Sequence, residues 1–390
     1  MHIQERAGAA YEHEAFADGW ELPLGAVRLE ALHTPGHRPE HCAFVLTDTS
    51  RSGEPWAVLS GDSLFVGDIA RPDLAVNAAD GAADLFRSLH ERLLALPDSC
   101  ELWPGHLGGS LCGGPGMDMK VSSTIGYERL HQPLLRLGRA EFADALLAGL
   151  GPQPPNFRAI VDANRRPPGR PAAHARGLAP HEVARRAQAG ELVVDVRTEL
   201  DFDEAHLPGA VSVTALRAGF GTKLAWLAPP SGGVVFVGRD DDEARHAIAL
   251  AAAVGISGAT SHLAGGMTAW RQQALPVERI PRLPVDALHE RWQSDPGALQ
   301  VLDVRERSEW EDGHLPGSLN VPFHDLGGVP AQLDPGRPVA VICASGQRAA
   351  VGASLMRRHG VPDVIHVVDG GVPLWARSGW PIEALPGHGV

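Results

Sequence analysis

Four cysteines are the side chains of this sequence most able to act as nucleophiles, and their surroundings separate one from the rest. They lie far apart and form no CxxC pair, so we expect neither a disulfide framework nor a thiolate zinc site; they are Cys42, Cys100, Cys112 and Cys343. Cys343 directly follows the apolar run VAVI (339–342) and precedes a stretch of helical character (349–358). The sequence therefore places this thiol in a loop between a buried strand and a helix.

The run CASGQR (343–348) gives that loop a specific chemistry. A loop that opens a helix presents successive backbone N–H groups, and the helix dipole adds positive potential. Such a field favours a thiolate, which is the nucleophilic form, and attracts the anionic end of a sulfur donor such as a thiosulfonate. Gly346 permits the tight turn. We predict that Cys343 is a catalytic nucleophile; the alternative is an inert buried thiol.

Three potential metal ligands form a second set of chemically able residues. An alternating strand over 26–34 ends near His37, an apolar strand around 56–60 ends near Asp62, and His106 follows a helical stretch over 82–96 and a short apolar segment. A further strand is expected around 42–47. Strand ends can converge on one point, which is how residues distant in sequence build a metal site. The sequence therefore predicts a metal site of His37, Asp62 and His106.

An internal duplication organises the second half of the chain. LVVDVRTELDFDEAHLPG (192–209) matches QVLDVRERSEWEDGHLPG (300–317), and each copy later carries Gly-Gly followed by Trp at equal spacing. Each copy spans roughly a hundred residues, the size of a small domain. The apolar runs 234–237 and 339–342 each lead into a helical stretch (242–253 and 349–358). Apolar runs followed by helices indicate a parallel sheet covered by helices.

The first copy lacks the thiol. Aligning VVFV (234–237) with VAVI (339–342) puts Gly238 where Cys343 stands in the second copy. The loop then continues with Arg239 and an acidic run (240–243) that would repel an anionic donor. We predict that this copy cannot perform the reaction and serves in packing or docking.

These patterns divide the chain into four parts. Residues 1–164 form the first domain, and 165–177, rich in Pro, Arg, Ala and Gly without an apolar period, form a linker. Residues 178–280 form the thiol-less copy and 281–390 the copy with Cys343.

Composition excludes several classes of partner. The chain has 390 residues, 44% of them hydrophobic, and a formal net charge of −13 at pH 7, so we expect binding neither to nucleic acid nor to anionic lipid. No window approaches the roughly 18 apolar residues of a membrane span. The N-terminus lacks the basic and apolar regions of a signal peptide, which predicts a cytoplasmic protein.

The second copy resembles the rhodanese family, whose active loop runs Cys-x-x-Gly-x-Arg before a helix. Its Asp-Val-Arg, His-Leu-Pro-Gly and Gly-Gly-x-x-x-Trp landmarks match as well. The resemblance implies that Cys343 accepts a sulfane sulfur as a persulfide and passes it to an acceptor, with thiosulfate or a glutathione-type persulfide as partners. It implies that the loop Ala344, Ser345, Gly346 and Gln347 cradles the sulfur. Arg348 would brace the loop or bind the donor, and Asp303 and Arg305 would be structural supports.

The first domain resembles the metallo-β-lactamase fold. GDSLFVGD (61–68) with RPDL (71–74) is most similar to its persulfide dioxygenase branch, which includes members fused to rhodanese domains. There a mononuclear Fe(II) is held by two His and one Asp, with positions open for substrate and O₂. The resemblance implies that His37 and Asp62 are iron ligands and that His106 matches a ligand of the second metal in dinuclear hydrolases. Zinc is the alternative metal.

The family's His-x-His-x-Asp-His motif is absent upstream of His37. We therefore expect an α/β chain made of a truncated metallo-β-lactamase-like αββα domain and two rhodanese-like α/β domains with parallel sheets. Either Met1 is a misplaced start or the domain is truncated. Missing strands would leave the metal site incomplete, lower its iron affinity, and expose apolar surface that seeks a partner, a homo-oligomer included.

Three functions compete. The first is an enzyme of sulfide and persulfide metabolism, in which a rhodanese-type sulfurtransferase is joined to a persulfide dioxygenase-like domain. The second is a glyoxalase II-like thioester hydrolase, which would use His37, Asp62 and His106 with two metals. The third is a non-catalytic persulfide carrier or scaffold, in which Cys343 holds sulfur for a partner.

Overall fold

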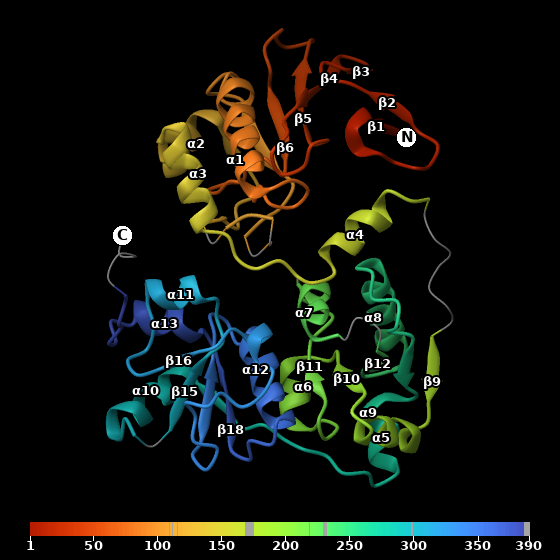
Figure 1. Ribbon diagram of the computed structural model, residues 1–390, viewed down its shortest axis with the longest axis vertical. Helices are drawn as coiled ribbons and strands as arrows, with labels where there is room; N and C mark the ends of the chain where they lie inside the picture. The colour runs from red at the N-terminus through yellow and green to blue at the C-terminus, as the bar shows by residue number, and fades with distance from the viewer. Residues whose placement is uncertain are drawn as a thin grey trace. The chain divides into compact units, whose positions relative to one another are not determined.

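The structure is a computed structural model that describes residues 1–108, 110, 112–114, 116–167, 175–217, 219–228, 232–297 and 299–385. The chain forms two units: Met1–Gln153 with Val161–Gly169, and Pro154–Ile160 with Arg170–Val390. Each unit is described by itself (Figure 1). Among the described residues, no helix combines the length and the apolar character needed to cross a membrane.

A six-stranded sheet organises the N-terminal unit, in the order β3-β4-β5-β6-β7-β8. Neighbouring strands are antiparallel except β6 and β7, which are parallel. Its strands are β3 (Glu21–Leu24), β4 (Val27–His33), β5 (Cys42–Asp48), β6 (Ala57–Gly61), β7 (Glu101–Pro104) and β8 (Ser123–Thr124), and a separate pair is β1 (His2–Gln4) and β2 (Glu14–Phe16). Its helices are η1 (Glu5–Ala7), α1 (Ala78–Arg87), the π-helix η2 (Ser88–Leu93), α2 (Ile125–His131), η3 (Pro133–Arg136) and α3 (Arg139–Ala148).

The two faces of this sheet differ because side chains alternate along each strand. Ala43, Val45 and Val58 point to one face and are buried in a cluster with residues of α1, η2 and α3. Leu59, which pairs with Phe44 and Trp103 on the neighbouring strands, points to the other. Leu59 and Trp103 remain 42% and 41% exposed. This face therefore carries large apolar side chains that are exposed to solvent.

Two five-stranded sheets with parallel strands organise the second unit. Their orders, β11-β10-β12-β13-β9 and β16-β15-β17-β18-β14, are equivalent strand by strand, as expected for a duplication. The first sheet contains β9 (Arg176–Leu178), β10 (Leu192–Asp195), β11 (Val211–Ser212), β12 (Val234–Val237) and β13 (Ser261–Leu263), with helices α5 (Pro180–Gln188), α6 (Glu199–Glu204), α7 (Phe220–Leu227), α8 (Asp241–Ala253) and α9 (Gly266–Gln272). The second contains β14 (Arg282–Pro284), β15 (Gln300–Asp303), β16 (Leu319–Asn320), β17 (Val339–Ile342) and β18 (Val364–Val368), with helices α10 (Val285–Ser294), α11 (Arg307–Asp312), η4 (Phe323–Asp325), α12 (Gln347–Arg358) and α13 (Gly371–Arg377). Helix α4 (Phe157–Asn164) precedes both sheets.

The two copies pack against each other through one hydrophobic cluster. It contains buried side chains of both sheets, such as Val235 and Val341. Polar contacts reinforce the joint: the N–H of Ser212 donates to Ser354 Oγ at 3.1 Å, and Arg358 donates to the carbonyl of Gly209 at 2.7 Å. The repeated copies are therefore continuous in their interior.

Two expectations about elements need correction. The helix expected over 82–96 begins earlier, at Ala78, because the Asn77 side chain accepts the N–H of Asp80, and it ends in a π-helix at Leu93. The linker expected over 165–177 is wrong at its end, since Arg176 and Gly177 belong to β9, which pairs with β13. These residues are ordered by backbone hydrogen bonds to β13, although their own sequence shows no strand pattern. Within that linker, residues 168–174 lie outside the described part of the chain.

Candidate functional site

Cys343 lies where the sequence places it, between the end of β17 and the start of α12. Its side chain is buried at 1% exposure. The backbone N–H groups of Ser345 and Gly346 donate to its Sγ at 3.5 Å and 3.1 Å. Gly346 caps α12 with a φ of 95°, a left-handed conformation that glycine adopts without strain. Two amides of the loop therefore converge on one sulfur atom.

The second glycine of the Gly370-Gly371 pair explains one of the repeated landmarks. The N–H of Val372 donates to the carbonyl of Cys343 at 3.0 Å. A Cβ on Gly371 would lie 1.9 Å from that carbonyl oxygen, so no other residue fits. Helix α13 thus begins directly against the backbone of Cys343.

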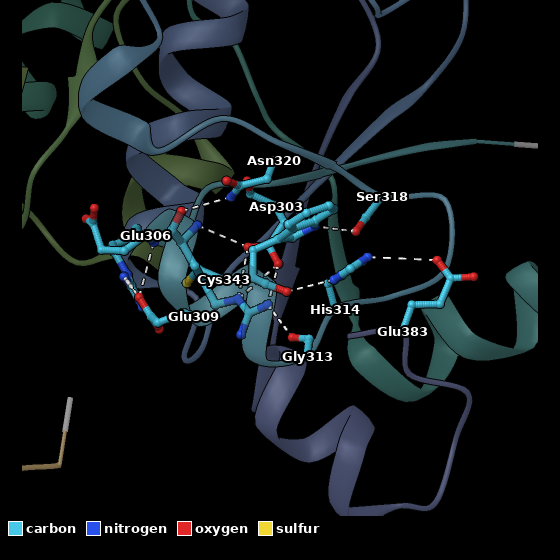
Figure 2. A network of polar contacts seen from close by, with 12 residues as sticks. Asp303, Glu306, Glu309, Gly313, His314, Ser318, Asn320, Cys343 and Glu383 are labelled. Atoms are coloured by element: carbon cyan, nitrogen blue, oxygen red, sulfur yellow. Dashed lines mark hydrogen bonds and ion pairs between the residues drawn. The ribbon is translucent and has the colours of Figure 1, made fainter. Parts of the chain in front are cut away.

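Arg348 joins the loop to helix α11. Its guanidinium nitrogens lie 2.5 Å and 2.8 Å from the two carboxylate oxygens of Glu309 (Figure 2). Burial alone would lower the pKa of Arg348, but the bond to Glu309 outweighs it and holds that pKa above its usual range. Burial acts to raise the pKa of Glu309, and the Arg348 bond reverses that direction as well. This two-bond pair ties the start of α12 to α11.

Asp303 and Arg305 form a buried pair beneath the same loop, with Arg305 Nη2 at 2.7 Å from Asp303 Oδ2 (Figure 2). Arg305 also donates to the carbonyl of Gly313 at 2.8 Å. Asp195 and Arg197 repeat this arrangement in the first copy, which has no thiol at the equivalent position. A pair present in both copies is what a structural support requires.

The loop of the first copy is built differently. Gly238 follows β12 as Cys343 follows β17, but a Cβ there would lie 2.7 Å from the carbonyl oxygen of Asp240 and 2.9 Å from the nitrogen of Ala244. The Asp240 side chain accepts the N–H of Glu243 at 2.9 Å, and Glu243 accepts the N–H of Arg239 at 2.7 Å. Two backbone N–H groups at this helix start, those of Arg239 and Glu243, are therefore bound by carboxylates of the same segment.

The N-terminal unit brings together the three metal ligands predicted from sequence. Asp62 lies between two histidines, with its Oδ1 at 2.7 Å from His106 Nδ1 and its Oδ2 at 3.4 Å from His37 Nε2. His37 is buried, and its Nδ1 lies 3.0 Å from the carbonyl of Arg71. That contact fixes the ring so that Nε2 faces Asp62.

Two further residues of this site, Cys112 and His41, were not predicted from the sequence. Cys112 offers a sulfur atom that, with ligand atoms of His37 and Asp62, forms a group whose members all lie within 4.8 Å of one another. His41 accepts the N–H of Asp62 through Nε2 at 2.8 Å and so positions the ligand backbone. Cys112 follows a glycine-rich segment without periodicity, and the only available signal was its place a few residues after His106.

The ionisable side chains of this site shift one another's pKa values. The hydrogen bond that His106 donates to Asp62 raises the pKa of His106 to about 10, and contact with Cys112 acts in the same direction. Burial acts to raise the pKa of Cys112, but contacts with His106 and His37 outweigh it and lower that pKa to about 6. Burial and the nearby His37 lower the pKa of His41 to about 4. Asp62 keeps a lowered pKa because the hydrogen bond from His106 overcomes its burial.

These donors fit a metal ion. Imidazole nitrogen, carboxylate oxygen and thiolate sulfur are ligands that divalent transition metals accept in proteins, Zn(II) and Fe(II) among them. His37, Asp62 and Cys112 would hold the ion, and His106 stands beside Asp62 as a fourth candidate.

A comparison with known protein families matches one domain family twice, once in each copy of the duplicated half of the chain. Residues 179–273 and 285–378 match the model of the Rhodanese-like domain. The chain carries two rhodanese-like domains. The second of them contains Cys343 and the first contains Gly238.

The N-terminal part is similar to metallo-β-lactamase-fold proteins. Persulfide dioxygenase ETHE1 of Bos taurus is 30% identical over 149 residues, which are 38% of this chain and 52% of that protein. The crystal structure of a metallo-β-lactamase from Staphylococcus aureus shares 25% identity with a TM-score of 0.54, covering 67% of this chain and 74% of that one. ETHE1 from Myxococcus xanthus shares 27% identity with a TM-score of 0.35, covering 42% and 64%. The chain spans about half the length of the curated relatives it matches.

These similarities agree with the expected fold, a metallo-β-lactamase-like part followed by rhodanese-like α/β domains with parallel sheets.

Proposed function

We propose that the chain is a sulfurtransferase and that Cys343 carries the transferred sulfur. The observation that supports this most is the convergence of the Ser345 and Gly346 N–H groups on Sγ. Donors in this arrangement are placed to stabilise negative charge on the sulfur and on a persulfide formed from it. Arg348, paired with Glu309, holds the loop in that shape.

The proposed reaction has two balanced steps. The Cys343 thiolate attacks the outer sulfur of thiosulfate, so that a new S–S bond forms, the old S–S bond breaks and sulfite leaves with the electron pair. A thiolate such as glutathione then attacks the outer sulfur of the Cys343 persulfide. The acceptor leaves as its own persulfide, and the Cys343 thiolate is regenerated.

Sulfur transfer from thiosulfate to cyanide or glutathione tests this assignment. We expect Cys343→Ser to abolish turnover, whereas Cys42→Ser, which changes a partly buried free cysteine of the other unit, should keep the wild-type rate. Equal rates in the wild type and Cys343→Ser would refute the proposal. A persulfide on Cys343 detected by mass spectrometry without multiple turnover would identify a sulfur carrier instead.

We further propose that the N-terminal unit binds a single metal ion through His37 and Asp62, as in a persulfide dioxygenase-like domain. Bound iron with open positions supplies O₂ chemistry on a thiol persulfide. His41 keeps Asp62 in place, and Cys112 and His106 add donors beside it. Metal analysis of the purified chain tests this. One ion per chain, lost in Asp62→Ala, is expected, and two ions per chain would favour the thioester hydrolase.

A further inference from the structure

A buried chain of hydrogen bonds connects the thiol-less domain to the Cys343 loop. Asp203, in α6 of the first rhodanese-like domain, lies with its Oδ2 at 2.7 Å from Nδ1 of His366 in β18 of the second. The other ring nitrogen of His366 lies 2.9 Å from the carbonyl oxygen of Gly346. The N–H of that same Gly346 donates to Cys343 Sγ at 3.1 Å. Three contacts therefore lead from a carboxylate in one domain to the sulfur in the other.

The direction of these bonds follows from their partners. A carbonyl oxygen only accepts, so Nε2 of His366 carries the hydrogen and donates to Gly346. Nδ1 lies within hydrogen-bonding distance of the carboxyl group of Asp203, and this contact fixes the orientation of the ring. With its carbonyl held by His366 and its N–H directed at the sulfur, Gly346 has both of its peptide planes fixed.

Both Asp203 and His366 are buried, so the pairing of their polar groups matters for stability. Asp203 and His366 are 3% and 1% exposed. A carboxylate in such a place is unfavourable unless it is paired. Oδ1 of Asp203 has no hydrogen-bond partner in the described part of the chain, so its polar contacts run through Oδ2, to His366 and to Arg282 at 3.4 Å. The buried carboxyl group of Asp203 in the thiol-less domain therefore makes its side-chain contacts with the neighbouring domain.

The duplication supplies an internal comparison. His262 stands in β13 where His366 stands in β18, because it pairs with Phe236 of β12 as His366 pairs with Val341 of β17. It is as deeply buried, at 2%. Its ring nitrogens have no hydrogen bond within the described residues, and Asp241 lies 3.6 Å from Nε2. The histidine is repeated, and the hydrogen-bonded carboxylate from the neighbouring domain belongs only to the copy with the thiol.

We propose that Asp203 and His366 are positioning residues that hold Gly346, and hence its N–H, against Cys343, so that the thiol-less domain completes the sulfur site of its neighbour. A second cross-domain contact reaches the same loop, where Lys223 Nζ lies 3.4 Å from Oε1 of Gln347. The inference rests on the proposed sulfurtransferase function for its role in turnover. Its effect on the reactivity of Cys343 can be measured separately.

Substitutions in the full-length chain test the relay with two readouts, sulfur transfer from thiosulfate and the alkylation rate of Cys343 by iodoacetamide, followed by mass spectrometry. His366→Leu removes the side-chain donor to the Gly346 carbonyl, which keeps only the helical bond from the Ala350 N–H, and should lower both the alkylation rate and kcat about tenfold, the effect expected for one hydrogen bond. His366→Gln, whose amide can still donate to Gly346, should restore both to within about threefold of the wild type. Asp203→Leu should lower both rates, and adding it to His366→Leu should lower them no further, because linked groups are not additive.

His262→Leu is the matched control, since it removes the equivalent buried histidine from the copy without a thiol. It should leave both rates unchanged, and thermal unfolding of each variant checks that the protein is folded. Wild-type alkylation of Cys343 in folded His366→Leu, an equal loss in His262→Leu, or additive losses in the double variant would overturn the relay. Absence of turnover in the wild type, with alkylation changed as expected, would instead count against the sulfurtransferase function.

Discussion

Cys112 differs most from the other cysteines in its expected reactivity. Its pKa is lowered to about 6 by contacts with His106 and His37 that outweigh its burial, whereas burial raises the pKa of Cys42 and Cys100 to about 11. The fraction of a cysteine that is in the reactive thiolate form rises as the pH passes through its pKa. In protein freed of metal with a chelator, we therefore expect iodoacetamide to label Cys112 already in mildly acidic buffer and Cys42 and Cys100 only in strongly alkaline buffer. Mass spectrometry of each site gives the pH profile.

The cause of that shift can be checked with one substitution. His106→Phe removes the hydrogen bond that does most to lower the pKa of Cys112, so the labelling profile of Cys112 should move to higher pH. Cys343 lies in the other unit and serves as the reference site, with an unchanged profile. An unmoved Cys112 profile would show that His106 does not act on this thiol.

The residues found and missed from sequence differ in how their contacts are made. Cys343 could be placed because its strand, loop and helix are contiguous. Cys112 and His41 could not, because their role depends on contacts with Asp62 across loops that carry no periodic pattern. The same holds for His366 and Asp203, whose bond joins residues far apart in the chain.

Helix α13 can start where it does because Gly371, its first residue, has no side chain. Gly371 and Gly379 both have positive φ, but a Cβ would meet the Cys343 carbonyl at Gly371 and nothing within 4 Å at Gly379. We expect Gly379→Ala to lower the free energy of unfolding by about 1 kcal/mol, the cost of a left-handed alanine. Gly371→Ala should cost about 2–4 kcal/mol, since the clash adds to that strain. Urea unfolding of the two variants measures the difference, and equal losses would refute this account of the landmark.

The loop after β12 should not become reactive when it is given a thiol. In Gly238→Cys the new Cβ would collide with the backbone of Asp240 and Ala244, and the carboxylates of Asp240 and Glu243 would lie close to the new thiol. In the Cys343→Ser background, we therefore expect no thiosulfate-dependent turnover from Gly238→Cys. Turnover comparable to that of the wild type would show that the loop sequence alone does not disable this copy.

The central strands of the duplicated half could be predicted from sequence because they are continuous apolar runs. The runs 234–237 and 339–342 match β12 and β17, and the helices after them begin within two residues of expectation. The short edge strand β9 escaped because its order comes from pairing with β13 and not from its own residues.

Metal binding should stabilise the N-terminal unit and leave the other unit unaffected. An ion held by His37, Asp62 and Cys112 binds only the folded form, so at a hundredfold excess over Kd it adds about 2.7 kcal/mol to the free energy of unfolding. We expect calorimetry of the metal-free chain to show that Zn(II) or Fe(II) raises one unfolding transition. Asp62→Ala should remove the rise and Cys343→Ser should keep it. A rise that persists in Asp62→Ala would place the ion elsewhere.

The architecture of the whole chain was largely accessible from sequence, because duplication and family landmarks are repeated local signals. The way the two copies join was not, since the hydrophobic cluster that contains Val235 and Val341 is built from residues that each copy also needs for its own sheet. Pairings between domains, such as Ser212 with Ser354, leave no trace in either local pattern.

That continuous interior has an evolutionary consequence. The copy without a thiol shares a hydrophobic cluster with the copy that contains Cys343, so its loss would expose buried apolar side chains of the other copy. We therefore expect substitutions in the loop around Gly238 to be tolerated better than substitutions of the side chains in the shared cluster.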